Sequence, residues 1–412
     1  MNGWTFLSVL GVIAFTILVA RLLRRKARGA SLGRSAEPSV WHPCGERVDA
    51  DLGFPPESSK NGFRPLPGGK NVRQTAGNPE RLRQQGLPPL ETTDDVLRWL
   101  GLELGAFLAM ANPTDRIRPR RTNYVEWSVP KKRGGVRVIC SPKPRLKAVQ
   151  WRIKDEILDR TPVHEAAHGF VRERSIVTNA APHVGRALVV NFDLHDFFGY
   201  VRYPRAVGVF RRMGYSLEAS RCLALLCTHQ PNLSQALDLP DGRAVILRAA
   251  RHAVQGAPTS PALANLALHR VDRRLIGLAR RFGATYTRYA DDLTFSGGED
   301  FKRGMIRFLP LVRRIVQDER FPLNAAKTRF MRPGQSQQVT GVVVNQKVNA
   351  RRGEYDRLKA IIHNARKAGS LDSQNREGRK DFRAYLLGRA AHLRRLNPER
   401  GRKLFEAIRA LP

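Results

Sequence analysis

One stretch decides the fold of this 412-residue chain: Thr285-Tyr286-Thr287-Arg288-Tyr289-Ala290-Asp291-Asp292-Leu293-Thr294-Phe295-Ser296. Residues with β-branched or aromatic side chains lie on both sides of the adjacent acids Asp291 and Asp292. Such side chains favour strands because they pack well on a pleated surface. The stretch therefore predicts a β-hairpin that presents two carboxylates at its turn.

The acidic pair is the first candidate for a functional site. Two ionised carboxylates side by side repel each other and shift each other's pKa unless a cation lies between them. Phosphoryl-transfer sites use such acids to hold two metal ions roughly 3.5 to 4 Å apart. The alternative is a solvated turn, where Asp is common because it bonds to the local backbone. The rest of the chain favours the metal site.

A third acid, Asp193, ends the apolar run Ala187-Leu188-Val189-Val190-Asn191-Phe192. This pattern predicts a buried strand that delivers one carboxylate at its end. The alternative is a helix N-cap, a role that contributes about 1 kcal/mol. Phe197 and Phe198 follow, and one of them is expected in the core. Phe198, five residues after Asp193, is placed to pack beneath a sugar and exclude a 2′-hydroxyl by size.

Basic residues form a second candidate cluster. Lys131-Lys132-Arg133-Gly134-Gly135 lies between two extended segments and predicts a basic hairpin with its turn at the glycines. Arg137 on the return strand can offer its planar fork to phosphate oxygens. Because it stands between two valines, we expect its charge to be poorly solvated without a ligand. The alternative for this segment is a solvated basic turn. Lys327, farther along the chain, is a further basic candidate, and its alternative is an ordinary surface lysine.

From about Thr92 to the C-terminus, the order of these motifs resembles that of the reverse transcriptases. Gln255-Gly256-Ala257-Pro258-Thr259-Ser260-Pro261 is similar to the family segment that lies against nucleotide and template; on its residues alone it is a loop that opens a helix. Asn179-Ala180-Ala181-Pro182-His183 and Val339-Thr340-Gly341 resemble the N-A-x-x-H and V-T-G motifs of the bacterial retron group. As ordinary structure, they fit a capped helical turn and a strand with a tight bend.

The resemblance implies an RNA-directed DNA polymerase whose two Mg²⁺ ions are held by Asp193, Asp291 and Asp292. It also places Lys327 near the leaving pyrophosphate, where it would donate a proton or neutralise charge. The candidates for nucleotide binding are Lys131, Arg137, Phe198, Gln255 and Gly256. The candidates for RNA recognition come from the two subgroup motifs and are Asn179, His183, Val339, Thr340 and Gly341.

The same resemblance implies the partners of the enzyme. The template would be a structured noncoding RNA encoded nearby, and synthesis would begin at a 2′-hydroxyl of that RNA and yield an RNA–DNA hybrid from dNTPs. The system would serve phage defence together with an effector protein. None of these partners is visible in the residues themselves.

The charge of the chain is strongly positive. Its 72 Lys and Arg residues against 36 Asp and Glu give a formal net charge of +36. Such an excess attracts polyanions and makes their binding depend on salt, since each neutralised phosphate releases counterions. A nucleic-acid substrate follows, and acidic lipids are a competing partner near the N-terminus.

The N-terminal region has two parts. Residues 4–23 are almost wholly apolar and approach the roughly 20 residues that cross a bilayer, and a basic cluster follows them. We therefore expect residues 1–28 to tether a cytoplasmic catalytic domain to the inner membrane, with a buried helix or a mistaken start codon as alternatives. Residues 29–90 are rich in Pro, Gly, Ser and Arg and predict a flexible basic linker.

The C-terminal region turns helical and basic. Apolar residues recur at helical spacing in Tyr355–Ile362, Phe382–Gly388 and Arg402–Ile408, with Arg and Lys between them. Three such helices would form a small bundle with a basic surface that follows a duplex. The alternative is an ordinary bundle with solvated charges. The four cysteines form no C-x-x-C pair, so neither zinc nor a disulfide framework is indicated.

Together these features predict an α+β right-hand polymerase with an antiparallel-sheet palm. Residues 91–345 would form fingers and palm, and residues 346–412 a helical thumb. Two other functions stay open on the sequence alone. One is a different bacterial reverse transcriptase, of the group II intron or abortive-infection kind, and the other is a non-catalytic RNA-binding scaffold, which the three intact carboxylates disfavour.

Overall fold

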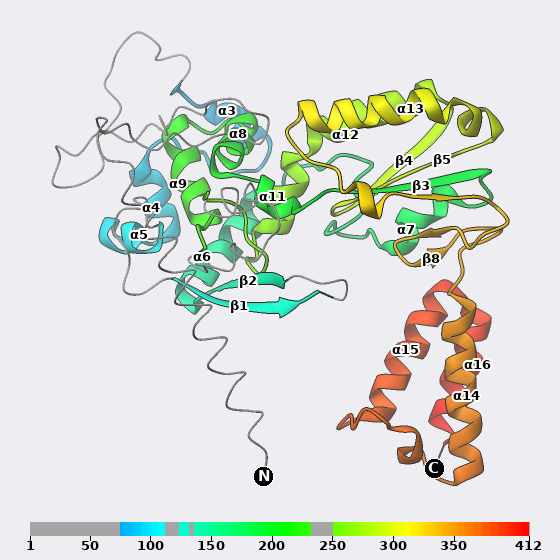
Figure 1. The fold of residues 1–412 in the computed structure, drawn as a ribbon. Helices are drawn as coiled ribbons and strands as arrows, with labels where there is room; N and C mark the ends of the chain where they lie inside the picture. The colour runs from blue at the N-terminus through cyan, green and yellow to red at the C-terminus, as the bar shows by residue number, and fades with distance from the viewer. Residues whose placement is uncertain (1–74, 112–122, 132–135, 232–249, 412) are drawn as a thin grey trace, which may run out of the picture. The chain divides into compact units, whose positions relative to one another are not determined.

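A four-stranded antiparallel sheet forms the centre of the fold in the computed structural model, which describes residues 75–111, 123–131, 136–231 and 250–411 (Figure 1). Its strands lie in the order β4-β5-β3-β6. Their bounds are β3 Leu188–Asp193, β4 Ala284–Tyr289, β5 Asp292–Gly297 and β6 Arg329–Met331. The hairpin predicted around the acidic pair is confirmed as β4 and β5.

The two faces of this sheet differ in chemistry. Phe295 of β5 points to one face, where it packs against Phe308 of α13 (Glu299–Asp318) beside α12 (His269–Arg281). Figure 1 shows both helices along this face. The alternate residues of β5, Asp292, Thr294 and Ser296, point to the opposite face, toward the short helix α7 (Ile176–Ala180). One face is therefore an apolar core, and the other carries carboxylates and hydroxyls.

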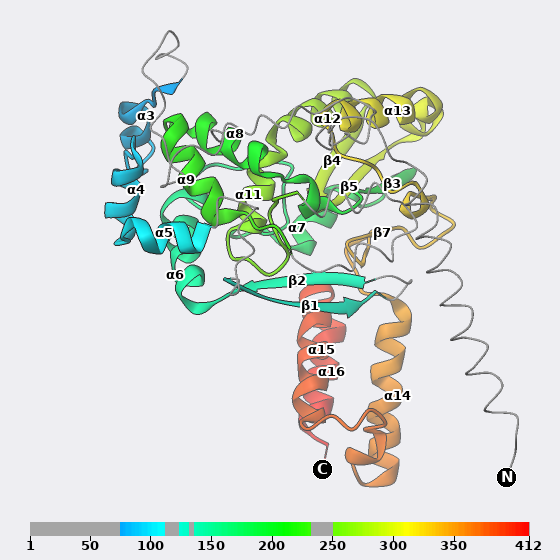
Figure 2. The same cartoon turned by 60° about the vertical axis from the view of Figure 1, so that its left-hand side comes forward.

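A helical subdomain packs around α9 (Leu217–Cys227). Every residue from Cys222 to Cys227 is buried, so α9 is buried on all of its sides, as expected for a helix that neighbours surround. These neighbours are α4 Thr93–Leu100, α5 Leu104–Ala111, α6 Pro144–Ile153 and α8 Tyr203–Met213. The subdomain is completed by η1 Lys154–Leu158, α11 Ser260–Ala267 and the two-stranded ribbon of β1 Tyr124–Pro130 and β2 Val136–Pro142 (Figure 2).

The folded chain begins earlier than the sequence predicted. Helix α3 (Pro79–Gln84) lies inside the segment expected to be a linker up to residue 90. Asn78 caps it by accepting a hydrogen bond from the Arg81 backbone, and Leu82 is fully buried. Asn78 is itself held by a 2.6 Å backbone bond to Gly214. The cap, the burial of Leu82 and the bond to Gly214 together hold a segment whose composition indicates flexibility.

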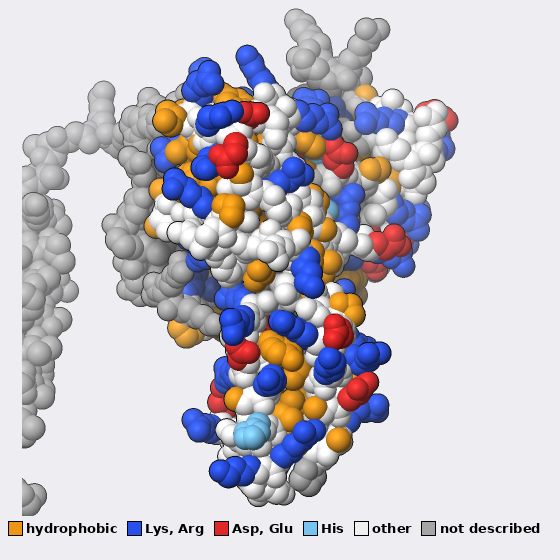
Figure 3. Space-filling model, turned by 90° about the vertical axis from the view of Figure 1, so that its right-hand side faces the viewer, with side chains coloured by type: hydrophobic (Ala, Val, Ile, Leu, Met, Phe, Trp, Pro, Cys, Tyr) orange, Lys and Arg blue, Asp and Glu red, His pale blue; other side chains and the backbone are white. Residues whose placement is uncertain are grey.

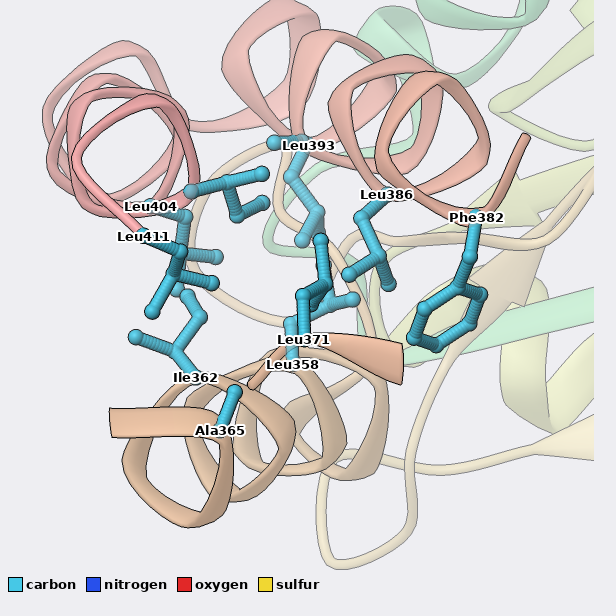
Figure 4. Packing of buried hydrophobic residues seen from close by; sticks show 11 residues of the cluster. Leu358, Ile362, Ala365, Leu371, Phe382, Leu386, Leu393, Leu404 and Leu411 are labelled. Atoms are coloured by element: carbon cyan, nitrogen blue, oxygen red, sulfur yellow. The ribbon is translucent and has the colours of Figure 1, made fainter. Parts of the chain in front are cut away.

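The three predicted C-terminal helices are confirmed as α14 (Arg352–Ala368), α15 (Phe382–Leu396) and α16 (Pro398–Arg409), with the short turn η6 (Asp372–Gln374) between the first two. Figure 4 shows their core, in which side chains from all three helices meet. The core residues are Leu358, Ile362, Ala365, Leu371, Phe382, Leu386, Ala390, Leu393, Leu404, Ile408 and Leu411.

No helix within the described residues has both the length and the apolar character needed to cross a membrane. The anchor expected in residues 1–28, like most of the linker expected in residues 29–90, lies outside the residues that the structure describes.

A buried ion pair joins the hairpin to α12. Arg288 of β4 donates two parallel hydrogen bonds, of 2.8 and 2.7 Å, to Asp272 of α12, and both side chains are fully buried. Tyr286 donates a further hydrogen bond of 2.8 Å to Asp272. The pair is bidentate and well satisfied, which is the arrangement that offsets the cost of removing two charges from water.

We predict that Arg288→Met lowers the free energy of unfolding by about 3–5 kcal/mol, because it leaves the Asp272 carboxylate buried without its cation. Arg280→Met is the matched control, since its ion pair with Glu165 is exposed, and it should change stability by less than about 1 kcal/mol. Urea denaturation of both variants measures the difference. Equal effects would show that the buried pair has no special role.

Candidate active site

The three predicted acids meet at one end of the sheet. Asp193, the last residue of β3, lies directly opposite Asp292, the first residue of β5. Ala290, with φ of 56°, turns the chain between the strands, and the Leu194 backbone donates a 3.0 Å hydrogen bond to the Asp291 carbonyl. Antiparallel pairing thus places a carboxylate from each strand side by side, with Asp291 in the adjoining turn.

The position of these acids opposes their ionisation. Burial, with the negative charges of Asp291 and Asp193, raises the pKa of Asp292 to about 7. Burial and the charge of Asp193 also raise the pKa of Asp291. Three ionised carboxylates in such a place need positive charge nearby. Their hard oxygen donors, converging from two strands and a turn, suit a divalent cation.

Lys327 supplies one positive charge to this site. Its ammonium nitrogen lies 2.9 Å from both carboxylate oxygens of Asp193. Lys327 ends the short helix η5 (Ala325–Lys327), which is anchored where the Asn324 backbone donates a 2.8 Å hydrogen bond to the Asp193 carbonyl. The sequence predicted Lys327 near the phosphates and left its position relative to the acids open. The structure places it against the first acid.

A small set of residues holds the acidic turn in place, and the sequence analysis did not predict these residues. Arg288, besides its pair with Asp272, donates to the Ala290 carbonyl at 3.1 Å and to the Asn265 side chain at 2.9 Å. Asn265 in turn donates to the Gly169 carbonyl at 2.8 Å. A Cβ at Gly169 would lie 2.6 Å from the Ala290 nitrogen, so only glycine fits against this turn.

A pocket of about 390 Å³ opens beside the acids. Its lining combines acidic, basic and small polar side chains, which suits a ligand that carries both phosphates and metal ions. The lining includes Asp193, Asp292, Lys327, Arg329, Arg351, Thr340 and Gly341, with Ile176, Asn191, Phe192, Tyr289 and Gln338 completing it.

The basic hairpin is present as β1 and β2, and Arg137 lies opposite Val129. Burial raises the pKa of Asp291, and the positive charge of Arg137 partly offsets that rise. Arg137 therefore lies within electrostatic reach of the acids. The expectation that Arg137 is poorly solvated was wrong, because this side chain is exposed. The outer face of a two-stranded ribbon stays open to water even between two valines. Lys131 is exposed beyond the end of β1, and residues 132–135 lie outside the described chain.

The loop at Gln255 and Gly256 docks on this ribbon. The Gln255 carbonyl accepts a 2.8 Å hydrogen bond from the Cys140 backbone of β2. Gly256 has φ of 111°, and a Cβ there would lie 2.8 Å from the Cys140 carbonyl oxygen. A glycine is required by both its backbone angle and its close approach to β2. Helix α11 then begins at Ser260, as the sequence predicted.

Of the two phenylalanines after Asp193, one lies in the core and the other is partly exposed, as the sequence predicted. Phe197 is 4% exposed and packs in the core, while Phe198 is half-buried, at a ring distance of 5.1 Å from Phe197. Both belong to the short helix η3 (Phe197–Tyr200). Phe198 therefore keeps a free surface beside the strand that carries Asp193.

The two retron-like motifs lie together against the polar face of the sheet. Val339 and Gly341 belong to a tight hairpin of β7 (Gln338–Val339) and β8 (Val342–Val343), with Thr340 at φ 47° in its turn. Asn179 and His183 are fully buried.

The expectation that these motifs bear on RNA recognition stays a prediction, and the exposure of their residues differs. Asn179, His183 and Val339 have no exposed surface for RNA, whereas Thr340 and Gly341 line the pocket beside the acids. A three-residue motif cannot indicate which of its side chains point inward.

Comparison with known proteins shows the family to which the chain belongs. The family described as "Reverse transcriptase (RNA-dependent DNA polymerase)" matches residues 129–350, more than half of the chain. The chain therefore belongs to the reverse transcriptases, and it is an RNA-directed DNA polymerase.

Three relatives define its group further. The chain is 42% identical to the retron Mx65 reverse transcriptase of Myxococcus xanthus, over 81% of this chain and 75% of that protein. It is 38% identical to the retron Mx162 reverse transcriptase of the same organism, over 81% and 69% of the two chains. It is 33% identical to the retron Ec86 reverse transcriptase of Escherichia coli, over 69% and 82%. The retron assignment made from the motifs is confirmed.

The raised pKa of Asp292 predicts an unusual pH dependence. Without metal, folded Asp292 holds a proton up to about pH 7, whereas the unfolded chain releases it near pH 3.8. The folded state thus binds more protons between these values, so stability falls as pH rises through this window. We predict that Asp292→Asn, measured in chelator at pH 8, has a higher Tm than the unsubstituted protein by on the order of a few degrees.

At pH 4 most of this difference in Tm should disappear, because folded Asp292 is then neutral and the unfolded carboxyl, with its ordinary pKa of 3.8, is only partly ionised. Asp300→Asn is the control, since the Asp300 carboxylate is exposed, and it should leave Tm unchanged at both pH values. A lower Tm for Asp292→Asn at pH 8 would contradict the electrostatic description of the site.

Proposed function

We propose that this reverse transcriptase copies a structured noncoding RNA of its own retron into single-stranded DNA. Two Mg²⁺ ions would be held by Asp193, Asp291 and Asp292, and synthesis would start from a 2′-hydroxyl of the RNA. The observation that carries the metal site is the pairing of Asp193 with Asp292 across neighbouring strands, with Asp291 in the adjoining turn.

The ions, when bound, would activate the primer hydroxyl and stabilise the leaving oxygen of the dNTP. The protein's part is to hold three carboxylates at fixed positions where solvent is largely excluded. Lys327 now neutralises Asp193 at 2.9 Å. Its ammonium group would meet the leaving pyrophosphate beside these acids, as proton donor or as fixed charge.

The nucleotide would approach from the ribbon side. Arg137, exposed yet within electrostatic reach of Asp291, is placed to bind triphosphate oxygens, with Lys131 farther along the same ribbon. Gln255 and Gly256 are fixed against that ribbon by the bond to Cys140, so this loop and the ribbon form one surface for the incoming nucleotide.

We assign α14, α15 and α16 to the thumb, which would bind the RNA–DNA hybrid. Figure 3 shows Lys and Arg side chains spread over this region, with fewer Asp and Glu among them. A groove of about 660 Å³ lies between α14 and α15, and Arg379 stacks over Tyr385 there at 4.0 Å. Aromatic and guanidinium planes beside positive charge suit a nucleic-acid strand. The arginines of the groove are Arg351, Arg357, Arg376, Arg379 and Arg389.

Substitution of one acid tests the proposed metal ligands. Asp291→Asn should lower primer extension on poly(rA)·oligo(dT) with Mg²⁺ by at least about 10³-fold, because the carboxylates act as one unit. The Kd for the hybrid should stay within about twofold, since substitution of one acid leaves the thumb and ribbon intact. Asp300→Asn is the control and should keep full activity. Failure of the unsubstituted protein to make DNA on any RNA would leave a scaffold role only.

A further prediction concerns the sugar. Phe198→Ala should raise the use of rNTPs relative to dNTPs by about 10- to 200-fold in kcat/KM, because it removes the bulk that excludes a 2′-hydroxyl. Phe198→Tyr keeps that bulk and should keep the ratio. An unchanged ratio in Phe198→Ala would place sugar selection elsewhere.

The cellular setting is also proposed. The relatives with retron names support a cognate noncoding RNA, and loss of cellular DNA product on deletion of the neighbouring RNA gene tests it.

Residues 4–23, apolar and followed by basic residues, support a tether to the inner membrane. Release of the protein by a carbonate wash of membranes would contradict that tether. A role in phage defence with an effector protein completes the proposal, and loss of phage resistance on deletion of the gene tests it.

A further inference from the structure

The buried residues Asn179 and His183 have no part in the chemistry described above, yet they contact the strands that carry it. His183 lies at the end of the short helix η2 (Ala181–His183), against the polar face of the sheet. Its ring joins two strands: Nδ1 lies 2.6 Å from the Ser296 hydroxyl of β5, and Nε2 lies 2.8 Å from the Thr287 hydroxyl of β4.

The hydrogens of this network can be assigned by following each donor. The Thr287 hydroxyl donates to the Asn179 carbonyl at 3.2 Å, so it must accept from His183 Nε2–H. Nδ1 then carries no proton and accepts from the Ser296 hydroxyl. Burial lowers the pKa of His183 to about 3, which agrees with a neutral ring of this single tautomer. Every polar atom of the imidazole is therefore satisfied by the catalytic hairpin.

The two strand contacts lie on either side of the acidic turn, one on each strand of the hairpin. Thr287 comes four residues before Asp291, and Ser296 comes four residues after Asp292. Ser296 shares the sheet face of Asp292, because residues two apart in a strand point the same way. The imidazole thus ties both strands of the hairpin to each other, and it does so on the face where Asp193 and Asp292 stand.

Asn179 extends the network to the second motif. Its backbone carbonyl accepts from Thr287, and its amide lies 3.5 Å from the Thr340 hydroxyl. Thr340 forms the turn of the β7–β8 hairpin and lines the pocket beside the acids. One buried chain of polar contacts therefore runs from the pocket wall, through Asn179 and Thr287, to His183 and the hairpin.

We propose that Asn179 and His183 are positioning residues: they clamp the catalytic hairpin and the Thr340–Gly341 turn in one fixed arrangement, and they do not read RNA. The inference rests on the proposed metal role of the hairpin acids. Full burial of both side chains leaves no surface for a nucleic acid. A network in which every group of His183 is paired can hold a site rigidly, and displacement by about 1 Å costs on the order of 10²-fold in rate.

The test uses the full-length protein, with Thr287→Val as the main variant. Valine has nearly the shape of threonine but neither accepts from His183 nor donates to Asn179. Thr161→Val is the matched control, since the Thr161 hydroxyl donates at 2.9 Å to the Ile157 carbonyl, away from the acids. Ser296→Ala and His183→Ala remove the other contacts, and thermal unfolding establishes that each variant is folded.

Three quantities are measured for each variant: kcat and KM for dTTP on poly(rA)·oligo(dT), the Kd for that hybrid, and Mn²⁺ affinity from the electron paramagnetic resonance of the free ion. We expect Thr287→Val to lower kcat about 10- to 100-fold and to weaken Mn²⁺ binding. KM for dTTP and the Kd for the hybrid should stay within about twofold, and Thr161→Val should match the unsubstituted protein.

The double variant His183→Ala/Thr287→Val adds a test of the network itself. If both residues act through one clamp, the double variant loses less kcat than the two single losses combined, because the His183–Thr287 contact is already lost in His183→Ala and only the bond to Asn179 remains to be removed. Three results would each overturn the proposal. They are additive losses of kcat in the double variant, an unchanged kcat in Thr287→Val, and a tenfold higher Kd for the hybrid with kcat preserved. DNA synthesis by the unsubstituted protein in the same assay tests the proposed function separately.

Discussion

Three neighbouring carboxylates, one buried and two half-buried, cannot all be ionised unless positive charge lies beside them, and the centre of this structure is arranged around that constraint. Burial and mutual repulsion raise the pKa of Asp292 to about 7. Lys327 relieves part of the repulsion at 2.9 Å from Asp193, and a divalent cation would relieve the rest. The site is thus unfavourable to the stability of the empty protein and favourable to metal binding, as expected where function competes with stability.

The protein holds these acids in place from the opposite faces of one sheet. On the apolar face, Arg288 is fixed by Asp272 and donates to the Ala290 carbonyl in the acidic turn. On the polar face, His183 joins the strands on either side of that turn. A turn braced from both faces keeps its carboxylates close together despite their repulsion, which is the preorganisation that two-metal chemistry requires.

The sequence was most informative where the chemistry is local. Alternation of β-branched and aromatic residues predicted the hairpin, and an apolar run predicted the strand that ends at Asp193. The partner of Arg288 was not predicted, because Asp272 lies sixteen residues earlier on another element. A signal did exist: Asp272 stands in the apolar stripe of α12, three residues before Leu275 and seven before Ala279. An acid at that position indicates a buried partner.

Other features were not predicted, because a short local pattern does not fix the solvent exposure of each of its side chains. Arg137 is exposed although two valines flank it, since a ribbon of two strands leaves one face to water. Asn179 and His183 belong to a motif associated with RNA, yet both are buried, since their hydrogen-bonding groups serve the hairpin. The segment expected to be a linker folds at α3 because of contacts with Gly214, which no local pattern reveals.

The central claim is that the carboxylates of Asp193, Asp291 and Asp292 converge on a pair of metal ions. Anomalous diffraction from crystals of the protein with Mn²⁺, an RNA–DNA hybrid and a non-hydrolysable dNTP analogue measures this directly. The account predicts two anomalous peaks roughly 3.5 to 4 Å apart, both within bonding distance of these acids. No peak at these acids, or a single ion bound away from Asp193, would contradict it.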